Sequence, residues 1–215
     1  KYIRLILHND DNTYLFSASI GIGHFDKEDI KIPDTIMKAE IALFKAKQSG
    51  KNRYVIFKDE YYENKVNEIL IMSAIKTSLK NNEFYLVYQP VMNMCEKTIY
   101  GIEALIRWEH AELGFIAPDK LIHLAEKTDD IHKVTEFVVK ESFKQLSLWN
   151  KEGINIRLLI NLSPKDLMNP RLPNMLLRHA NFYGINKNMV TLEITEATQL
   201  IKISIFLCFL TMAST

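Results

Sequence analysis

Strand-like and helix-like segments alternate along most of this chain, and that alternation restricts the folds that it can adopt. The predicted strands cover residues 84–91, 98–108, 156–163 and 189–195, and the predicted helices cover residues 118–127, 133–152 and 174–183. Such alternation is typical of an α/β fold with a parallel sheet. A complete (β/α) barrel needs about 250 residues, so the sequence predicts a partial TIM-like barrel.

Three of the predicted strands carry a lone polar residue within an apolar run: Glu103, Asn161 and Glu193. Burying a carboxylate or an amide costs free energy unless the group has a partner. All three side chains carry oxygen near strand ends, where barrel enzymes place their functional groups. Hard divalent cations take oxygen ligands, so the pattern predicts a shared Mg²⁺ or Mn²⁺ site.

Each of these residues also has an ordinary structural explanation. Glu103 could form an ion pair with Arg107 or another cation at the end of its strand. Asn161 could close an Asx turn ahead of Ser163, and Glu193 could simply face solvent. The residues by themselves leave these alternatives open.

The first 80 residues follow a different pattern. Residues 14–25 predict a strand, and a helix is expected to start at Pro33-Asp34, with Asp34 as its N-cap and Gly50 as its C-cap. A short strand over residues 53–57 would complete the closing part of an α+β module. Residues 59–79 predict a charged amphipathic helix that joins this part to the barrel.

Composition excludes several classes of protein. A net charge of +1 gives no electrostatic case for binding a nucleic-acid polymer. Polar residues 10–12 interrupt the first apolar stretch, so no signal peptide is expected. Cys95 and Cys208 are too few for a disulfide framework, which fits a reducing cytoplasm. The apolar run at residues 203–210 is far shorter than the roughly 20 residues of a membrane span, so no membrane contact is expected from this chain.

Five motifs between residues 81 and 200 resemble the EAL domain, which is the barrel of cyclic di-GMP phosphodiesterases. In chain order they are Tyr88-Gln89-Pro90, Glu103-Ala104-Leu105-Ile106-Arg107-Trp108, Leu124-Ala125-Glu126, Asn161-Leu162-Ser163 and Glu193-Ile194-Thr195-Glu196. A lone Glu-Ala-Leu tripeptide would be worthless as evidence, whereas five motifs in the right order are specific. The resemblance implies that residues 81–202 are the N-terminal half of an EAL domain.

The preceding segment resembles the C-terminal end of a GGDEF domain, the diguanylate cyclase fold. The matching segments are residues 19–23, 39–47 and 50–53, with Glu40 where family members usually carry Asp. The signature loop of that domain is not in the sequence, so cyclase activity is not expected. The expected parts are a GGDEF remnant at 1–57, a linker helix at 58–80, half of an EAL domain at 81–202 and a non-homologous hydrophobic tail at 203–215.

The resemblance to EAL enzymes implies roles for six residues. The expected ligands of Mg²⁺ or Mn²⁺ are Glu103, Asn161 and Glu193, and the expected contacts to cyclic di-GMP are Gln89, Leu105 and Arg107. The planar guanidinium of Arg107 suits a phosphate, and a metal-activated water would open the phosphodiester to give the linear dinucleotide. Glu196 is expected at best in a supporting position.

The resemblance also implies that part of the site is absent from this sequence. EAL enzymes carry an adjacent Asp pair on the next strand, a Lys after it and another Glu. Asp129-Asp130 lies between two predicted helices and upstream of Asn161, so it is not that pair. We therefore expect these 215 residues to be inactive or nearly so, with hydrolysis a property of an intact parent.

Two other interpretations remain. The chain could be a non-catalytic module that binds cyclic di-GMP or a protein partner, or a broken gene product, since half a barrel leaves open sheet edges. The tail at 203–215 fits either a buried element or a premature or frameshifted end. The resemblance leaves open a homodimer of the parent and its anchoring to the inner membrane through a preceding region.

Overall fold

A computed structural model describes residues 4–9, 12–24 and 32–194. Its contacts divide the chain into two compact units, Lys1–Leu70 and Ile71–Thr215, and helix α2 (Asp59–Lys80) contributes to both. Among the described helices, none has the length and apolar character that a membrane span requires. Glu196 and the predicted tail at 203–215 lie outside the described residues.

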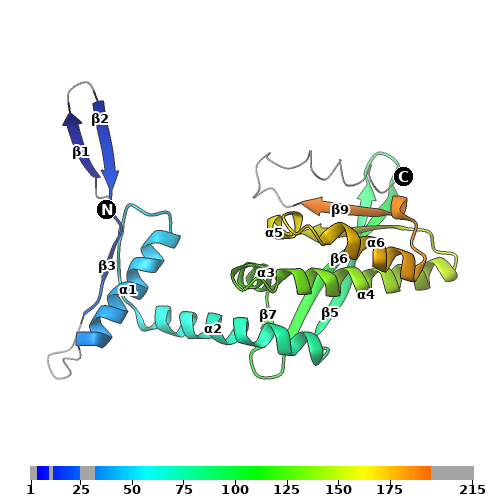
Figure 1. The fold of residues 1–215 in the computed structure, drawn as a ribbon, viewed down its shortest axis with the longest axis horizontal. Helices are drawn as coiled ribbons and strands as arrows, with labels where there is room; N and C mark the ends of the chain where they lie inside the picture. The colour runs from blue at the N-terminus through cyan, green and yellow to red at the C-terminus, as the bar shows by residue number, and fades with distance from the viewer. Residues whose placement is uncertain (1–3, 10–11, 25–31, 195–215) are drawn as a thin grey trace. The chain divides into compact units, whose positions relative to one another are not determined.

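The first unit contains two small sheets and one long helix. Strand β1 (Arg4–Asn9) pairs antiparallel with β2 (Asn12–Ser17), and β3 (Ile20–Ile22) pairs parallel with β4 (Tyr54–Ile56). Helix α1 (Ile32–Gln48) connects β3 to β4 and packs against both (Figure 1). The single strand predicted over residues 14–25 is therefore wrong. The strand ends at Ser17, and a new strand begins at Ile20, because β2 and β3 belong to different sheets.

The ends of α1 differ in how well the sequence predicted them. The helix begins at Ile32, so Asp34 lies within its first turn and is not the predicted N-cap. A carboxylate in the first turn still complements the helix dipole. At the other end Gly50 has a φ of 99°, and the backbone N–H of Lys51 donates to the carbonyl of Ala46 at 3.1 Å. This is the Schellman arrangement, which confirms Gly50 as the predicted terminating glycine.

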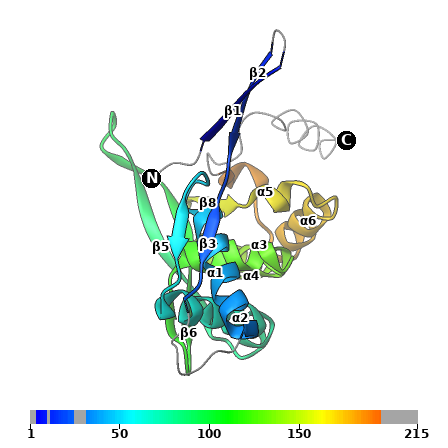
Figure 2. The ribbon, with the colours of Figure 1, turned by 90° about the vertical axis from the view of Figure 1, so that its left-hand side faces the viewer.

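The second unit is built on one mixed sheet with the strand order β5-β6-β8-β9. The strands are β5 (Phe84–Asn93), β6 (Thr98–His110), β8 (Arg157–Leu162) and β9 (Val190–Ile194), and β7 (Gly114–Ile116) pairs with the end of β6. β5 and β6 form a long antiparallel hairpin (Figure 2). β6, β8 and β9 are parallel, as the alternation predicted, and helices connect β6 to β8 and β8 to β9.

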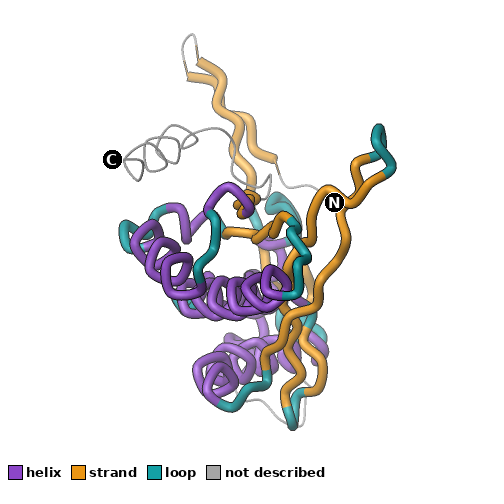
Figure 3. The backbone as a smooth tube through the Cα atoms, turned by 90° about the vertical axis from the view of Figure 1, so that its right-hand side faces the viewer, coloured by secondary structure: helices purple, strands orange, loops and turns teal. Residues whose placement is uncertain are grey.

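Helices cover one face of this sheet (Figure 3). They are α3 (Pro118–Lys127), α4 (Ile131–Lys151) and α6 (Leu172–Tyr183), close to the predicted ranges. The short α5 (Pro164–Leu167), the 3₁₀ turn η1 (Lys187–Met189) and strand β7 were not predicted. Elements of three or four residues are too short to show a hydrophobic period, and so this pattern cannot reveal them.

The hydrophobic core lies between the sheet and the helices. Ile106 and Trp108 of β6 and Ile160 of β8 point into it and are almost completely buried. The ring of Trp108 lies 4.8 Å from that of Phe84 on the neighbouring strand. The helix-covered face of the sheet is therefore the structural face, and the opposite face is left for polar groups.

Candidate functional site

The six residues predicted to form the site all lie on the sheet face opposite the helices. Successive side chains of a strand point to opposite faces. Since residues 104, 106 and 108 point into the core, Glu103, Leu105 and Arg107 point the other way. Gln89 of β5 pairs in register with Glu103 and therefore shares its face.

Asn161 and Glu193 reach the same face from the next two strands. Leu158 and Ile160 of β8 belong to the core, so Asn161 points away from it. Asn161 pairs in register with Glu193 of β9. The amide nitrogen Nδ2 of Asn161 donates a hydrogen bond of 2.6 Å to Oε1 of Glu103. The structure thus brings together the three residues that were predicted to share one cation.

The electrostatics of this group fit a cation site. Burial raises the pKa of the Glu193 carboxyl above its usual 4.5, and the negative charge of Glu103 raises it further. Two carboxylates that repel each other next to an amide form an oxygen-rich set suited to Mg²⁺ or Mn²⁺. Among the described residues, no group of three or more His, Cys, Asp and Glu side chains is placed to hold a metal. A metal at this site would therefore depend on the amide of Asn161 as well as the two carboxylates.

The alternative explanations of Glu103 and Asn161 do not match these contacts. The guanidinium of Arg107 donates to the carbonyl of Ile106 at 2.8 Å. Within the part of the chain that the structure describes, Glu103 forms no ion pair with Arg107 or another cation, and it accepts from Asn161. The Asn161 side chain bonds to Glu103 across the sheet and not to the turn that follows it. Arg107 lies four residues beyond Glu103, roughly 13 Å along an extended strand.

A polar network directly after Asn161 was not predicted from the sequence. Ser163 caps the short helix α5 in a capping box with Asp166, and Asp166 also contacts helix α4. Lys165 binds Asp129 in the turn between α3 and α4, and its hydrogen bond and charge lower the pKa of the Asp129 carboxyl. The signal was present in the sequence, because Ser163-Pro164-Lys165-Asp166 places a capping Ser, a first-turn Pro and an acid at the third helical position.

Comparison with protein families identifies one match, to the EAL domain, over residues 72–206. The biofilm architecture maintenance protein MbaA of Vibrio cholerae serotype O1 is 31% identical over 202 residues, which cover 88% of this chain and 25% of MbaA. The bifunctional diguanylate cyclase/cyclic di-GMP phosphodiesterase MucR of Pseudomonas aeruginosa is 31% identical over 187 residues, which cover 85% of this chain and 27% of MucR. The chain spans about a quarter of the length of these curated relatives.

Solved structures resemble the same region. The solved structure of the PaMucR phosphodiesterase in complex with c-di-GMP superimposes with a TM-score of 0.62 at 28% identity, covering 67% of this chain and 59% of the chain in that structure. The S helix-GGDEF-EAL part of Vibrio cholerae LapD, bound to c-di-GMP, gives a TM-score of 0.58 at 14% identity over 93% of this chain and 47% of the chain in that structure. The LapD likeness concerns the fold alone.

Proposed function

This chain belongs to the EAL domain family, and from that premise we propose that it is part of a metal-dependent phosphodiesterase that hydrolyses cyclic di-GMP to the linear dinucleotide. The observation that carries the proposal is the convergence of Glu103, Asn161 and Glu193 on one sheet face, with 2.6 Å between Asn161 and Glu103. Relatives named as cyclic di-GMP phosphodiesterases support the reaction class.

Glu103, Asn161 and Glu193 would hold Mg²⁺ or Mn²⁺. Such an ion, when bound, polarises the phosphodiester and lowers the pKa of a water molecule. The protein's part is to keep the three side chains on neighbouring strands at a fixed spacing, which the 2.6 Å contact and the in-register pair of Asn161 and Glu193 support. An ion would also offset the repulsion that raises the pKa of Glu193.

Gln89, Leu105 and Arg107 are proposed to bind the nucleotide on the same face. Gln89 is exposed next to Glu103, and Arg107 lies roughly 13 Å further along β6. A cyclic dinucleotide carries two phosphates and is large enough to contact both an ion at Glu103 and the guanidinium of Arg107. Arg107 would bind one of its phosphates through the planar guanidinium.

We further propose that these 215 residues alone bind the ion weakly and turn over little or no substrate. Two carboxylates and one amide leave much of a six-coordinate ion to water, since Mg²⁺ prefers six oxygen ligands. The proposed division of the chain is a GGDEF remnant at 1–57, a linker helix at 58–80 and half an EAL domain at 81–202. The likeness to the S helix-GGDEF-EAL part of LapD supports this order of parts.

One assay tests the function. The purified chain is incubated with cyclic di-GMP and Mn²⁺, product is followed by chromatography, and Mn²⁺ binding is measured separately by electron paramagnetic resonance. The expected result is weak Mn²⁺ binding that Glu103→Ala abolishes, with little or no hydrolysis. Glu109→Ala is the matched control, because Glu109 lies near the end of the same strand with an exposed side chain.

The possible outcomes separate the interpretations. Hydrolysis that Glu103→Ala abolishes would show that the chain is active and would overturn the proposed inactivity. Binding of cyclic di-GMP without Mn²⁺ binding or turnover would favour a non-catalytic module. Mn²⁺ binding that survives Glu103→Ala and Glu193→Gln would show that the proposed ligands are wrong.

A further inference from the structure

The turn after Asn161 is held by a buried carboxylate. Strand β8 ends at Leu162, Ser163 follows as the N-cap of α5, and the side chain of Asp166 is 1% exposed. Oδ2 of Asp166 accepts a hydrogen bond from the backbone N–H of Ser163 at 3.2 Å, while the backbone N–H of Asp166 donates to Oγ of Ser163 at 3.2 Å. Only Leu162 separates Asn161 from this capping box.

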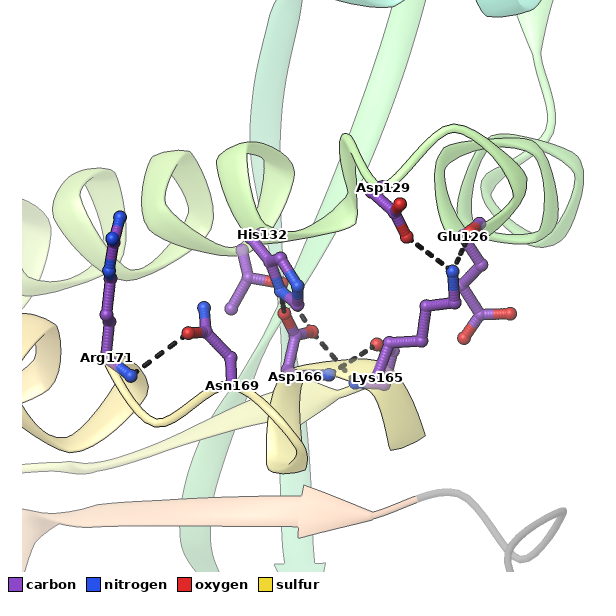
Figure 4. A network of polar contacts seen from close by, with 9 residues as sticks. Glu126, Asp129, His132, Lys165, Asp166, Asn169 and Arg171 are labelled. Atoms are coloured by element: carbon purple, nitrogen blue, oxygen red, sulfur yellow. Dashed lines mark hydrogen bonds and ion pairs between the residues drawn. The ribbon is translucent and has the colours of Figure 1, made fainter.

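The same carboxylate ties the turn to helix α4. Oγ1 of Thr135 donates to Oδ2 of Asp166 at 2.7 Å, and Nδ1 of His132 lies 2.9 Å from Oδ1 (Figure 4). A carboxylate this deeply buried is tolerated only with such partners, because removing one member leaves the others unsatisfied. The capping box alone would satisfy the N-terminus of α5. The two contacts from α4 to Asp166 in addition hold the turn against the helices that cover the sheet.

A second contact anchors the turn at its outer side. Nζ of Lys165 donates to the backbone oxygen of Glu126 at 2.5 Å and to Oδ1 of Asp129 at 2.6 Å (Figure 4). The Asp129 side chain is 76% exposed, and exposed ion pairs contribute little to stability. The buried Asp166, and not Lys165, is therefore the residue on which the position of the turn depends.

We propose that Asp166 is a positioning residue for Asn161, acting through the β8–α5 turn together with Thr135 and His132. The inference rests on the proposed function, because its consequence is the geometry of the cation site. Asn161 must keep its side chain next to Glu103, and the strand end that carries it is fixed two residues later by Asp166. Groups that orient a metal ligand typically change metal affinity 10- to 100-fold when they are removed.

The test compares two substitutions of Asp166. Asp166→Ala removes every acceptor and is expected to shift the side-chain NH₂ resonance of Asn161 in ¹⁵N spectra and to weaken Mn²⁺ binding about tenfold. Asp166→Asn is expected to keep the Asn161 resonance and the Mn²⁺ affinity of the unaltered chain, because its amide oxygen can still accept from Ser163 and Thr135. Asp119→Ala is the matched control, since Asp119 is an exposed acid in the first turn of α3.

The two readouts separate this inference from the proposed function. If the unaltered chain binds no Mn²⁺, the cation site is wrong, and the Asn161 resonance alone decides the positioning role. A folded Asp166→Ala variant with an unchanged Asn161 resonance and unchanged Mn²⁺ affinity would overturn the inference and leave Asp166 as a helix cap. If Asp166→Ala does not fold, Thr135→Val removes a single bond, and it must shift the same resonance for the inference to stand.

Discussion

Replacing Glu193 by glutamine is expected to stabilise the second unit by about 1 kcal/mol at neutral pH. Glu103 and Glu193 face the same side on strands separated by β8, which puts their backbones roughly 10 Å apart. At an effective dielectric constant of about 20 to 40, two unit charges at that distance repel by about 1–2 kcal/mol, and salt reduces this value. Glutamine keeps the shape and removes the repulsion.

Glu103→Gln should raise the free energy of unfolding by less than Glu193→Gln does. Glu103 accepts the hydrogen bond from Asn161, and the loss of its charge weakens that bond by about 1 kcal/mol. That loss offsets the relief of repulsion, so the net change should be close to zero. Urea unfolding at pH 7 measures both variants, and Glu109→Gln, an exposed acid near the end of the same strand as Glu103, is the control.

The pH dependence gives a second, independent check. The folded-state pKa of Glu193 is raised above 4.5, so the folded protein binds this proton more tightly than the unfolded chain does. The unaltered protein therefore loses stability as the pH rises from 4.5 through the folded pKa, and Glu193→Gln does not. The extra free energy of unfolding of Glu193→Gln over the unaltered protein should be complete above that pKa and absent below pH 4.5. A destabilised variant at pH 7, or a gain that persists at low pH, would refute the reasoning.

Three further predictions concern the fold around the site, each measured by urea unfolding. Leu158→Ala, at a fully buried core position, should cost about 3 kcal/mol, while Leu148→Ala, 45% exposed on α4, should cost less than about 1 kcal/mol. Gly101→Ala should cost about 2 kcal/mol or more, because the added methyl would lie 2.9 Å from a backbone oxygen of the facing strand. The neighbouring Ser78 hydroxyl and then the charge of His110 lower the pKa of the Glu83 carboxyl. The stabilisation from Glu83 is therefore present above pH 4.5 and is lost as the pH falls through the folded pKa, and Ser78→Ala should weaken that pH dependence.

Much of the fold could be predicted from the sequence because its long elements have a clear period. The helix at Pro118–Lys127 has the predicted bounds, and the four predicted strands of the second unit differ from their predicted ends by at most two residues. The failures have local causes. Asp34 is not the N-cap because α1 starts two residues earlier, at Ile32. Residues 14–25 read as one strand because β2 and β3 are both apolar, and only their pairing partners separate them.

The candidate site was predictable as a set of residues but not as a set of contacts. The lone polar residues Glu103, Asn161 and Glu193 stand out because their strands are otherwise apolar. Their contacts depend on which strands are neighbours in the sheet, and hydrophobic periodicity does not specify that strand order. The role of Asp166 could not be predicted for another reason. An acid near a helix start is ordinary in sequence, and its burial depends on Thr135 and His132, about 30 residues away.

The register of β5 against β6 links the stability of the sheet to the geometry of its site. A slip of one residue would turn Glu103 and Arg107 into the core and Trp108 out of it, so the buried ring of Trp108 opposes any such slip. The register shift of this pair lies between Val91 and Met92, beyond the pairing of Gln89 with Glu103. The stretch that carries the site is therefore the regular part of the hairpin, held by the face that the helices cover. It follows that polar changes on the site face should alter ligand binding more than folding, while apolar changes one residue away should do the reverse.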